Sequence, residues 1–405
     1  MLSRVTGSFA AVSVAGALVL ATACGDSEKS KQAATSGPAA ALTSGAVVLA
    51  AEDAAPVASS SAKAAVDPVV AIPAGTHALG SLPGDRGRDP TLEPPGTEVA
   101  LGAFDIDRYL YPNDLSSPPK TGVSRKQAAK LCEERGRRLC TEVEWERACK
   151  GPEGDAFAGG AGWSKACAND PKTCASAFGV LGMGAFREWT ASDVEAVGEV
   201  KGGASVRGAD RSASDVDRRC ARRSPVDATR EDDTVGFRCC GGDAVTAGFP
   251  KPVEGAPFEP TELSAERLAQ ILRAVPHLAK LSGDPKYFED EAAAREVTNR
   301  ADAGTPDGYK LTTAPLLWRP VLGEEVVVVT VQVGNDSLVA AFHRLPGDRL
   351  RVASTLVLTK DPGPVVLAYD RSAPKRLEWS TCWQCRGETG RIAYRDDRRV
   401  VITQE

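Results

Sequence analysis

The segment from residue 123 to 149, VSRKQAAKLCEERGRRLCTEVEWERAC, constrains the fold more than any other part of the chain. It contains two capping boxes, in which a hydroxyl residue precedes glutamine or glutamate by three positions and both exchange hydrogen bonds with the backbone at a helix start. These are Ser124 with Gln127 and Thr141 with Glu144. Gly136 supplies the left-handed conformation that ends the first helix. The segment therefore predicts two short helices, which carry Cys132 and Cys149 near their ends and form a small unit that disulfides can cross-link.

The N-terminus predicts export. An apolar run, residues 9–23, follows Arg4 and is shorter than the roughly 20 residues of a membrane span. It has the layout of a secretory signal peptide with a small-residue cleavage site. Cys24 follows directly and resembles the lipobox of bacterial lipoproteins, in which the thiol is diacylated and becomes the mature N-terminus. The alternative is ordinary signal peptidase cleavage after residues 21–23, and either reading predicts export.

Composition and hydrophobic pattern predict how the chain is divided. Residues 1–23 are the signal peptide, and 24–67, almost all Ala, Ser, Gly, Pro and charge, are a lipidated cysteine with a disordered tether. At 405 residues the chain is long enough for two domains, which we place at 68–242 and 261–405 with a Pro- and Gly-rich linker at 243–260. The second domain, of unknown function, shows one amphipathic helix followed by alternating strands. We expect a mainly antiparallel β unit with one or two helices.

The charge pattern argues against nucleic-acid binding. The chain carries 49 basic and 54 acidic residues, for a net charge of −5, and has no basic stripe with interleaved aromatic residues. Residues 207–230 are rich in arginine but contain interspersed aspartates, which predicts a solvated, salt-bridged loop region.

The expected localisation is the cell envelope, on a membrane through the lipid anchor, and on the outer membrane if the source is a diderm bacterium.

Cysteine usage favours a disulfide framework. Without Cys24, ten cysteines remain in an oxidising compartment. They are Cys132, Cys140, Cys149, Cys167, Cys174, Cys220, Cys239, Cys240, Cys382 and Cys385. A zinc site or a thioredoxin-like role is an alternative for Cys382 and Cys385, but no second ligand pair lies nearby, and a local disulfide is favoured. The three histidines, His77, His277 and His343, are far apart in sequence, so we predict no histidine-built metal site and no cofactor.

Five short motifs occur in order between residues 72 and 238. They are IPAGTHALGS (72–81), GRRLCTEVEWE (136–146), LGMGAFREWT (181–190), KGGAS (201–205) and GFR (236–238). This series resembles the signature of the formylglycine-generating enzyme family, also called the sulfatase-modifying factor domain. The resemblance implies an α+β, loop-rich formylglycine-generating-enzyme-like (C-type-lectin-like) fold with few regular elements.

The resemblance also implies disulfide pairings. Family members with two structural bridges join the first-helix cysteine to the one after GFR, and the second-helix cysteine to one in an R-C-A-x-R motif. The implied bonds are Cys132–Cys239 and Cys149–Cys220. Cys140 is then a candidate partner for Cys240, and Cys167 for Cys174.

The family's catalytic residues have no counterpart here. Active members oxidise a cysteine of a Cys-x-Pro-x-Arg motif to formylglycine with a copper ion held by two cysteines, since thiolates select Cu(I). The corresponding positions of this chain hold Asp210 and Asp215. The family's calcium motif is also altered, with Leu181 and Ala185 in place of Asp and Asn. The histidine ligands of the related non-heme iron branch are not recognisable. The metal prediction is therefore none, and the chain resembles a pseudoenzyme.

Three functional hypotheses remain. The first is a binding or structural module for an unknown protein, peptide or glycan, with Trp145, Trp189 and Phe237 as core residues. Its candidate binding loop contains Asp210, Arg211, Asp215, Arg218 and Arg222. The second is an active sulfatase-modifying oxidase or related oxidoreductase with relocated catalytic residues, in which Asp210, Asp215 and Asp217 would bind a hard cation or act in acid–base chemistry. The third assigns the function to the C-terminal unit.

Overall fold

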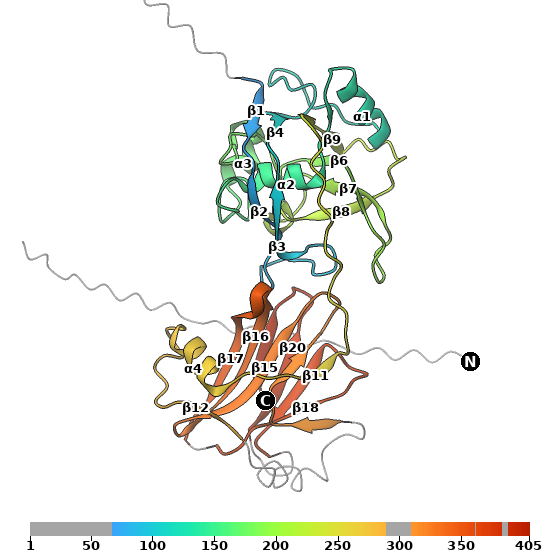
Figure 1. Ribbon diagram of the computed structural model, residues 1–405. Coiled ribbons are helices and arrows are strands. Elements are labelled where there is room, and N and C mark those ends of the chain that lie inside the picture. Colours follow the sequence, from blue (N-terminus) through green and yellow to red (C-terminus); the bar gives the residue numbers. More distant parts are fainter. Residues whose placement is uncertain (1–66, 289–308, 361, 383–387) are drawn as a thin grey trace, which may run out of the picture. The chain divides into compact units, whose positions relative to one another are not determined.

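The computed structural model describes residues 67–288, 309–360, 362–382 and 388–405 (Figure 1). They belong to one compact unit, Ala64–Glu405. The predicted signal peptide, Cys24 and the tether up to residue 66 lie outside the described residues, as does Cys385. No described helix combines the length and apolar character that crossing a membrane requires.

Residues 67–242, here called the N-terminal region, contain short elements joined by long loops. The helices are α1 (Arg125–Glu133), α2 (Glu142–Lys150) and α3 (Lys165–Asn169), with the 3₁₀ helices η1 (Pro171–Thr173) and η2 (Asp215–Arg218). The strands are β1 (Val69–Ile72), β2 (Gly75–Gly80), β3 (Pro95–Leu101), β4 (Phe104–Asp107), β5 (Arg138–Leu139), β6 (Arg187–Val194), β7 (Gly203–Arg207), β8 (Arg223–Val226), β9 (Val235–Phe237) and β10 (Cys239–Gly241). They form two four-stranded sheets, in the orders β1-β4-β10-β5 and β8-β7-β6-β9, and the ribbon β2-β3. The predicted loop-rich α+β fold is confirmed.

Both predicted capping boxes are present. The Ser124 hydroxyl accepts from the Gln127 N–H at the start of α1, and the Gln127 side chain accepts from the Ser124 N–H at 2.7 Å. Thr141 and Glu144 make the same exchange at the start of α2. Gly136 follows α1 with a φ of 69°, in the left-handed region that glycine tolerates. Both helices therefore begin where local hydrogen bonds favour a start.

Four disulfides cross-link the N-terminal region. They are Cys132–Cys239, Cys140–Cys240, Cys149–Cys220 and Cys167–Cys174, the same pairings that the sequence analysis names. Cys239 and Cys240 are neighbours on β10, so their side chains point to opposite faces of the sheet. One bonds to α1 and the other to the residue that follows β5. The C-terminal strand of the region is therefore fastened on both faces.

Charged residues make up much of the interior of this region. All nine residues of α2 are buried, including three glutamates. Arg238 and Glu188 form a bidentate pair with both side chains buried, at 2.6 and 2.8 Å. Burying such charges is costly unless each is paired and hydrogen-bonded. Trp145, Trp189 and Phe237 are fully buried beside these pairs, which confirms their predicted role as core residues.

Residues 256–405, here called the C-terminal region, form two antiparallel sheets. The strands are β11 (Phe258–Pro260), β12 (Pro285–Tyr287), β13 (Lys310–Thr312), β14 (Leu316–Trp318), β15 (Val326–Val333), β16 (Asp336–Leu345), β17 (Arg349–Leu358), β18 (Val366–Tyr369), β19 (Arg376–Ser380), β20 (Thr389–Tyr394) and β21 (Val400–Gln404), and the helices are α4 (Ala265–Arg273) and the 3₁₀ helix η3 (Pro346–Asp348). One sheet runs β11-β14-β15-β16-β17, with β12 also paired to β15, and the other runs β13-β18-β19-β20-β21.

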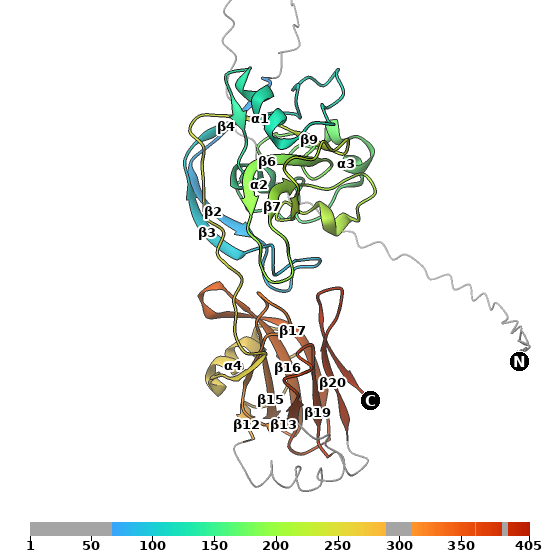
Figure 2. The same ribbon diagram turned by 90° about the vertical axis from the view of Figure 1, so that its right-hand side faces the viewer.

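The C-terminal region has three layers. Apolar side chains of the two sheets, among them Trp318 and Trp379, fill the space between the sheets. α4 lies on the other face of the first sheet (Figures 1 and 2). Its Leu268 and Leu272 belong to one apolar cluster with valines of β15. α4 ends at Arg273, three residues before Pro276, which cannot continue a helix. The predicted antiparallel unit with few helices is confirmed.

The predicted linker, residues 243–260, is only partly a linker. β11 begins inside it, at Phe258, and pairs with β14. At its other end, Val245 and Phe249 pack against the N-terminal region. The strand β20 has a weak signal in the sequence, because its start, TGR, has the composition of a turn.

Candidate binding pocket

Three loops of the N-terminal region meet at one edge of the sheet β8-β7-β6-β9. β6 and β9 are parallel, with Arg187 opposite Val235, so the residues that lead into both strands lie at the same edge. β7 is antiparallel to β6, so the residues that follow β7 reach that edge as well. The topology thus gathers residues 185–187, 210–212 and 233–234.

A cavity of about 560 Å³ opens at this edge. Its lining combines apolar, hydroxyl and charged side chains. The lining residues are Pro119, Thr121, Ala185, Phe186, Arg187, Asp210, Arg211, Ser212, Asp233 and Thr234. We call this cavity the candidate pocket. Charges of both signs beside an apolar surface suit a ligand that is itself partly apolar and partly charged.

Hydrogen bonds fix one wall of the candidate pocket. Arg187 donates to the Thr234 hydroxyl at 2.8 Å and lies 3.4 Å from the Asp232 carboxylate. Asp232 in turn accepts from the N–H and the hydroxyl of Thr234. Burial alone would raise the pKa of Asp232, but the bonds from Thr234 and the charge of Arg187 lower it. Asp232 therefore stays ionised and holds Arg187 in place.

The opposite wall contains Asp210 and Arg211, two residues of the predicted binding loop. The exposed Asp210 carboxylate accepts from the N–H and hydroxyl of Ser212, at 2.9 and 2.7 Å, and these bonds lower its pKa. Beneath the loop, Arg218 donates to the carbonyls of Asp210 and Arg211, at 2.9 and 3.0 Å, and stacks on Trp163. Arg218 is therefore buried and supports the loop, and it does not line the candidate pocket.

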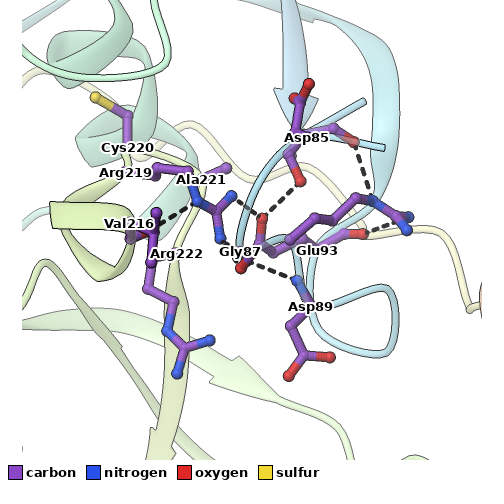
Figure 3. A network of polar contacts seen from close by, with 12 residues as sticks. Asp85, Gly87, Asp89, Glu93, Val216, Arg219, Cys220, Ala221 and Arg222 are labelled. Atoms are coloured by element: carbon purple, nitrogen blue, oxygen red, sulfur yellow. Dashed lines mark hydrogen bonds and ion pairs between the residues drawn. The ribbon is translucent and has the colours of Figure 1, made fainter. Parts of the chain in front are cut away.

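Figure 3 shows a second support of the same loop. Arg219 forms a bidentate pair with Glu93, at 2.6 and 2.8 Å, and also donates to the carbonyl of Gly87. Burial would raise the pKa of Glu93, but Arg219 lowers it, so the pair remains ionic. The sequence predicted a solvated arginine-rich segment here, yet four of its arginines are buried. They are Arg207, Arg218, Arg219 and Arg223.

The remaining predicted residues lie apart from the candidate pocket. Asp215 is exposed on η2 and does not line it. Arg222 is half-buried, points away from the Glu93 network in Figure 3 and does not line the pocket either. Sequence reasoning missed Phe186, Arg187, Asp233 and Thr234 as lining residues. The available signal was their position, because Phe186 and Arg187 lie inside the motif LGMGAFREWT and Asp233 and Thr234 come two to three residues before GFR.

The residues at this edge do not fit the copper centre of the formylglycine-generating enzymes. Cu(I) requires soft thiolate ligands, whereas the expected positions hold Asp210 and Asp215. All eight cysteines between residues 67 and 242 are in disulfides, so none presents a thiolate. Within the described ranges, no three His, Cys, Asp or Glu side chains are grouped so that they could hold a metal ion.

Cys382, in the C-terminal region, is disulfide-bonded. Its predicted partner, Cys385, lies outside the described residues, so that pairing stays a prediction.

Comparison with known proteins supports the resemblance found in the sequence. Among solved structures, PvdO from Pseudomonas aeruginosa has 19% sequence identity and a TM-score of 0.35, covering 42% of this chain and 93% of its own. Treponema denticola variable protein 1 has 15% identity and a TM-score of 0.33, covering 42% of this chain and 94% of its own. No curated protein compared with the chain matches it. Residues 110–241 match the family model of the sulfatase-modifying factor enzyme 1-like domain, and this part of the chain therefore forms a domain of that family.

Proposed function

We propose that the N-terminal region is a binding module that holds a peptide segment of a partner protein in the candidate pocket. The observation that carries this proposal is a formed pocket beside absent copper ligands. The pocket walls are fixed by buried arginines, whereas aspartates stand at the two positions where the oxidase needs thiolates. Such a site retains recognition and loses the oxidation chemistry of the family.

The lining favours a peptide over a sugar. Phe186, Pro119 and Ala185 offer apolar surface, and Arg211 and Asp233 place opposite charges around it. An extended peptide supplies apolar and charged side chains together with backbone hydrogen-bonding groups. Sugars are usually held by polar groups together with aromatic faces on which the rings stack. Among its described residues, this lining has a single aromatic side chain, Phe186, which offers little stacking surface.

The cellular setting belongs to the same proposal. Four disulfides in one small region are typical of proteins that fold in an oxidising compartment. Together with the signal-like N-terminus, they support export, and Cys24 would attach the module to a membrane of the cell envelope. Metabolic labelling with a radioactive fatty acid tests this step. Label should enter the native chain and be lost in Cys24→Ser; a native chain without label would contradict the anchor.

The binding proposal is tested with the full chain in detergent and a displayed library of random peptides. We expect selected peptides to lose affinity at least tenfold in Phe186→Ala and in Arg211→Glu, because both side chains line the candidate pocket. Arg222→Glu is the matched control, since Arg222 is in the same loop and does not line the pocket. Selected peptides that bind all three variants equally, or a library that yields none while a glycan array yields ligands, would overturn the peptide proposal.

The competing oxidase function requires a different measurement. Purified chain incubated with Cu(I) and a Cys-x-Pro-x-Arg peptide should form no aldehyde, because the eight cysteines of the N-terminal region are all in disulfides and present no thiolate to the copper. Mass spectrometry of the peptide detects the conversion directly. Formation of formylglycine would refute the loss of oxidation chemistry and would favour relocated catalytic residues.

A further inference from the structure

The first residues of the predicted linker are bound to the N-terminal region. The Thr141 hydroxyl donates to the Val245 carbonyl at 2.7 Å, and the Val245 N–H donates to Glu144 at 3.0 Å. Val245, Ala247 and Phe249 pack on an apolar cluster that contains Leu79, Leu101 and Val143. We call residues 243–249 the strap, because they run back across α2 after the last strand of the region.

Phe249 of the strap covers two buried arginines. Its ring lies 4.1 Å from the Arg223 guanidinium and 5.8 Å from that of Arg207. Both arginines bind Glu142, Arg223 at 2.7 Å and Arg207 at 3.5 Å, and Arg207 also binds Glu146 at 2.7 Å. An aromatic face attracts a cation and excludes water from it, which strengthens these ion pairs.

Arg207 joins both ends of the candidate binding loop. As the last residue of β7, it directly precedes the loop 208–222. Its guanidinium donates to the backbone carbonyls at the other end of that loop. The acceptors are Cys220, Ala221 and Arg222, at 3.2, 3.1 and 3.3 Å. The conformation of Arg207 therefore sets how the loop closes.

We propose that Phe249 is a positioning residue for the candidate pocket, and that docking of the strap holds the loop 208–222 closed. When the strap is docked, Arg207 is confined between Phe249 and the two glutamates, and Asp210 and Arg211 stay on the pocket wall. When the strap leaves, Arg207 becomes hydrated and the loop loosens. This inference rests on the proposed binding function and adds its regulation: whatever displaces the strap lowers affinity at the pocket.

Hydrogen–deuterium exchange of the full chain tests the inference without any ligand. In Phe249→Ala we expect exchange in the loop 208–222 to accelerate about tenfold, the equivalent of two lost cation–π contacts. Phe249→Trp keeps an aromatic face and should restore slow exchange. Phe249→Leu keeps apolar volume without the ring and covers the case in which the alanine variant fails to fold. Val253→Ala, an exposed position beyond the strap, should change nothing.

The outcomes separate this inference from the proposed function. Faster exchange in the strap with an unchanged loop in both Phe249→Ala and Phe249→Leu would overturn the positioning role. A loosened loop with weaker binding of a library-selected peptide supports both proposals. A loosened loop in a chain for which no peptide can be selected supports the positioning role and refutes the peptide-binding function.

Discussion

The interiors of the N-terminal and C-terminal regions are stabilised by different interactions. In the C-terminal region, two sheets bury valines, leucines and tryptophans against each other, and strand ladders satisfy the backbone. In the N-terminal region, disulfides and buried ion pairs share that role with three separate apolar clusters. The difference follows from how much of each region is regular strand. Loops leave backbone carbonyls without the hydrogen bonds that a strand ladder would have given them.

In the loop-rich N-terminal region, arginine side chains supply hydrogen-bond donors for these backbone carbonyls. Arg207 and Arg218 each donate to several backbone carbonyls of the loop 208–222. A guanidinium has five N–H groups in a planar fork, so one side chain can satisfy several acceptors at once. An arginine-rich stretch in a loop-rich fold therefore indicates a scaffold as readily as a binding surface.

Removing the two disulfides of β10 should have the largest effect and should separate the regions. Replacing Cys132, Cys239, Cys140 and Cys240 by alanine should cost about 2–5 kcal/mol for each bridge, since each closes a loop of 107 or 100 residues. Hydrogen exchange should then rise throughout the N-terminal region, while β15 and β16 keep their protection. An equal rise in both regions would show that they unfold as one cooperative unit.

Breaking a buried ion pair tests how much such pairs stabilise the N-terminal region. Arg238→Met leaves Glu188 charged and unpaired in the interior, which should cost about 3–5 kcal/mol in free energy of unfolding. Replacing Glu188 by leucine as well should recover part of the loss. In the C-terminal region, Arg319→Met should cost about 1 kcal/mol, because its partner Glu259 is 41% exposed and its other partner, Glu325, keeps a second ion pair with Arg344. Urea titration measures all three variants, and equal losses for the two arginines would contradict the contrast.

Mild acid should weaken the N-terminal region through His77. Burial, together with the charges of Lys150, Arg147 and Arg207, lowers the pKa of His77 from 6.5 to about 4, although Glu146 opposes this. Between these values the unfolded chain binds the proton and the folded chain does not, so stability falls as pH drops from 6.5 to 4. The full effect is on the order of 3 kcal/mol. His77→Gln should flatten the pH profile of the unfolding free energy in this window, and an unchanged slope would refute the assignment.

An exposed arginine of the arginine-rich segment 207–230 should contribute little to stability. Arg230 lies 3.6 Å from Asp232 but is 66% exposed, and such pairs contribute about 0–1 kcal/mol. Arg230→Ala should therefore leave the free energy of unfolding almost unchanged. A loss as large as that of Arg238→Met would mean that burial does not explain which arginines stabilise the region.

Local signals in the sequence predicted well, and long-range ones did not. The capping residues Ser124 and Thr141 act on neighbours three positions away, so their spacing suffices. The burial of Arg218 and Arg219 depends on Trp163 and Glu93, which are distant in sequence, and no local pattern shows it. The strand β20 also depends on distant residues. Gly390 weakens its strand pattern, yet a side chain there would collide with Trp379 and with the Thr403 carbonyl.

The disulfide pattern has a consequence for how the chain matures. If cysteines paired in the order in which they leave a membrane channel, Cys132 would join Cys140, and Cys239 would join Cys240. None of the four observed bonds joins neighbours except Cys167–Cys174, and the partners of Cys132 and Cys140 emerge about a hundred residues later. Any such early bond would have to be exchanged by thiolate attack before the native set forms. We expect production of this protein to depend on a disulfide isomerase more than on an oxidase.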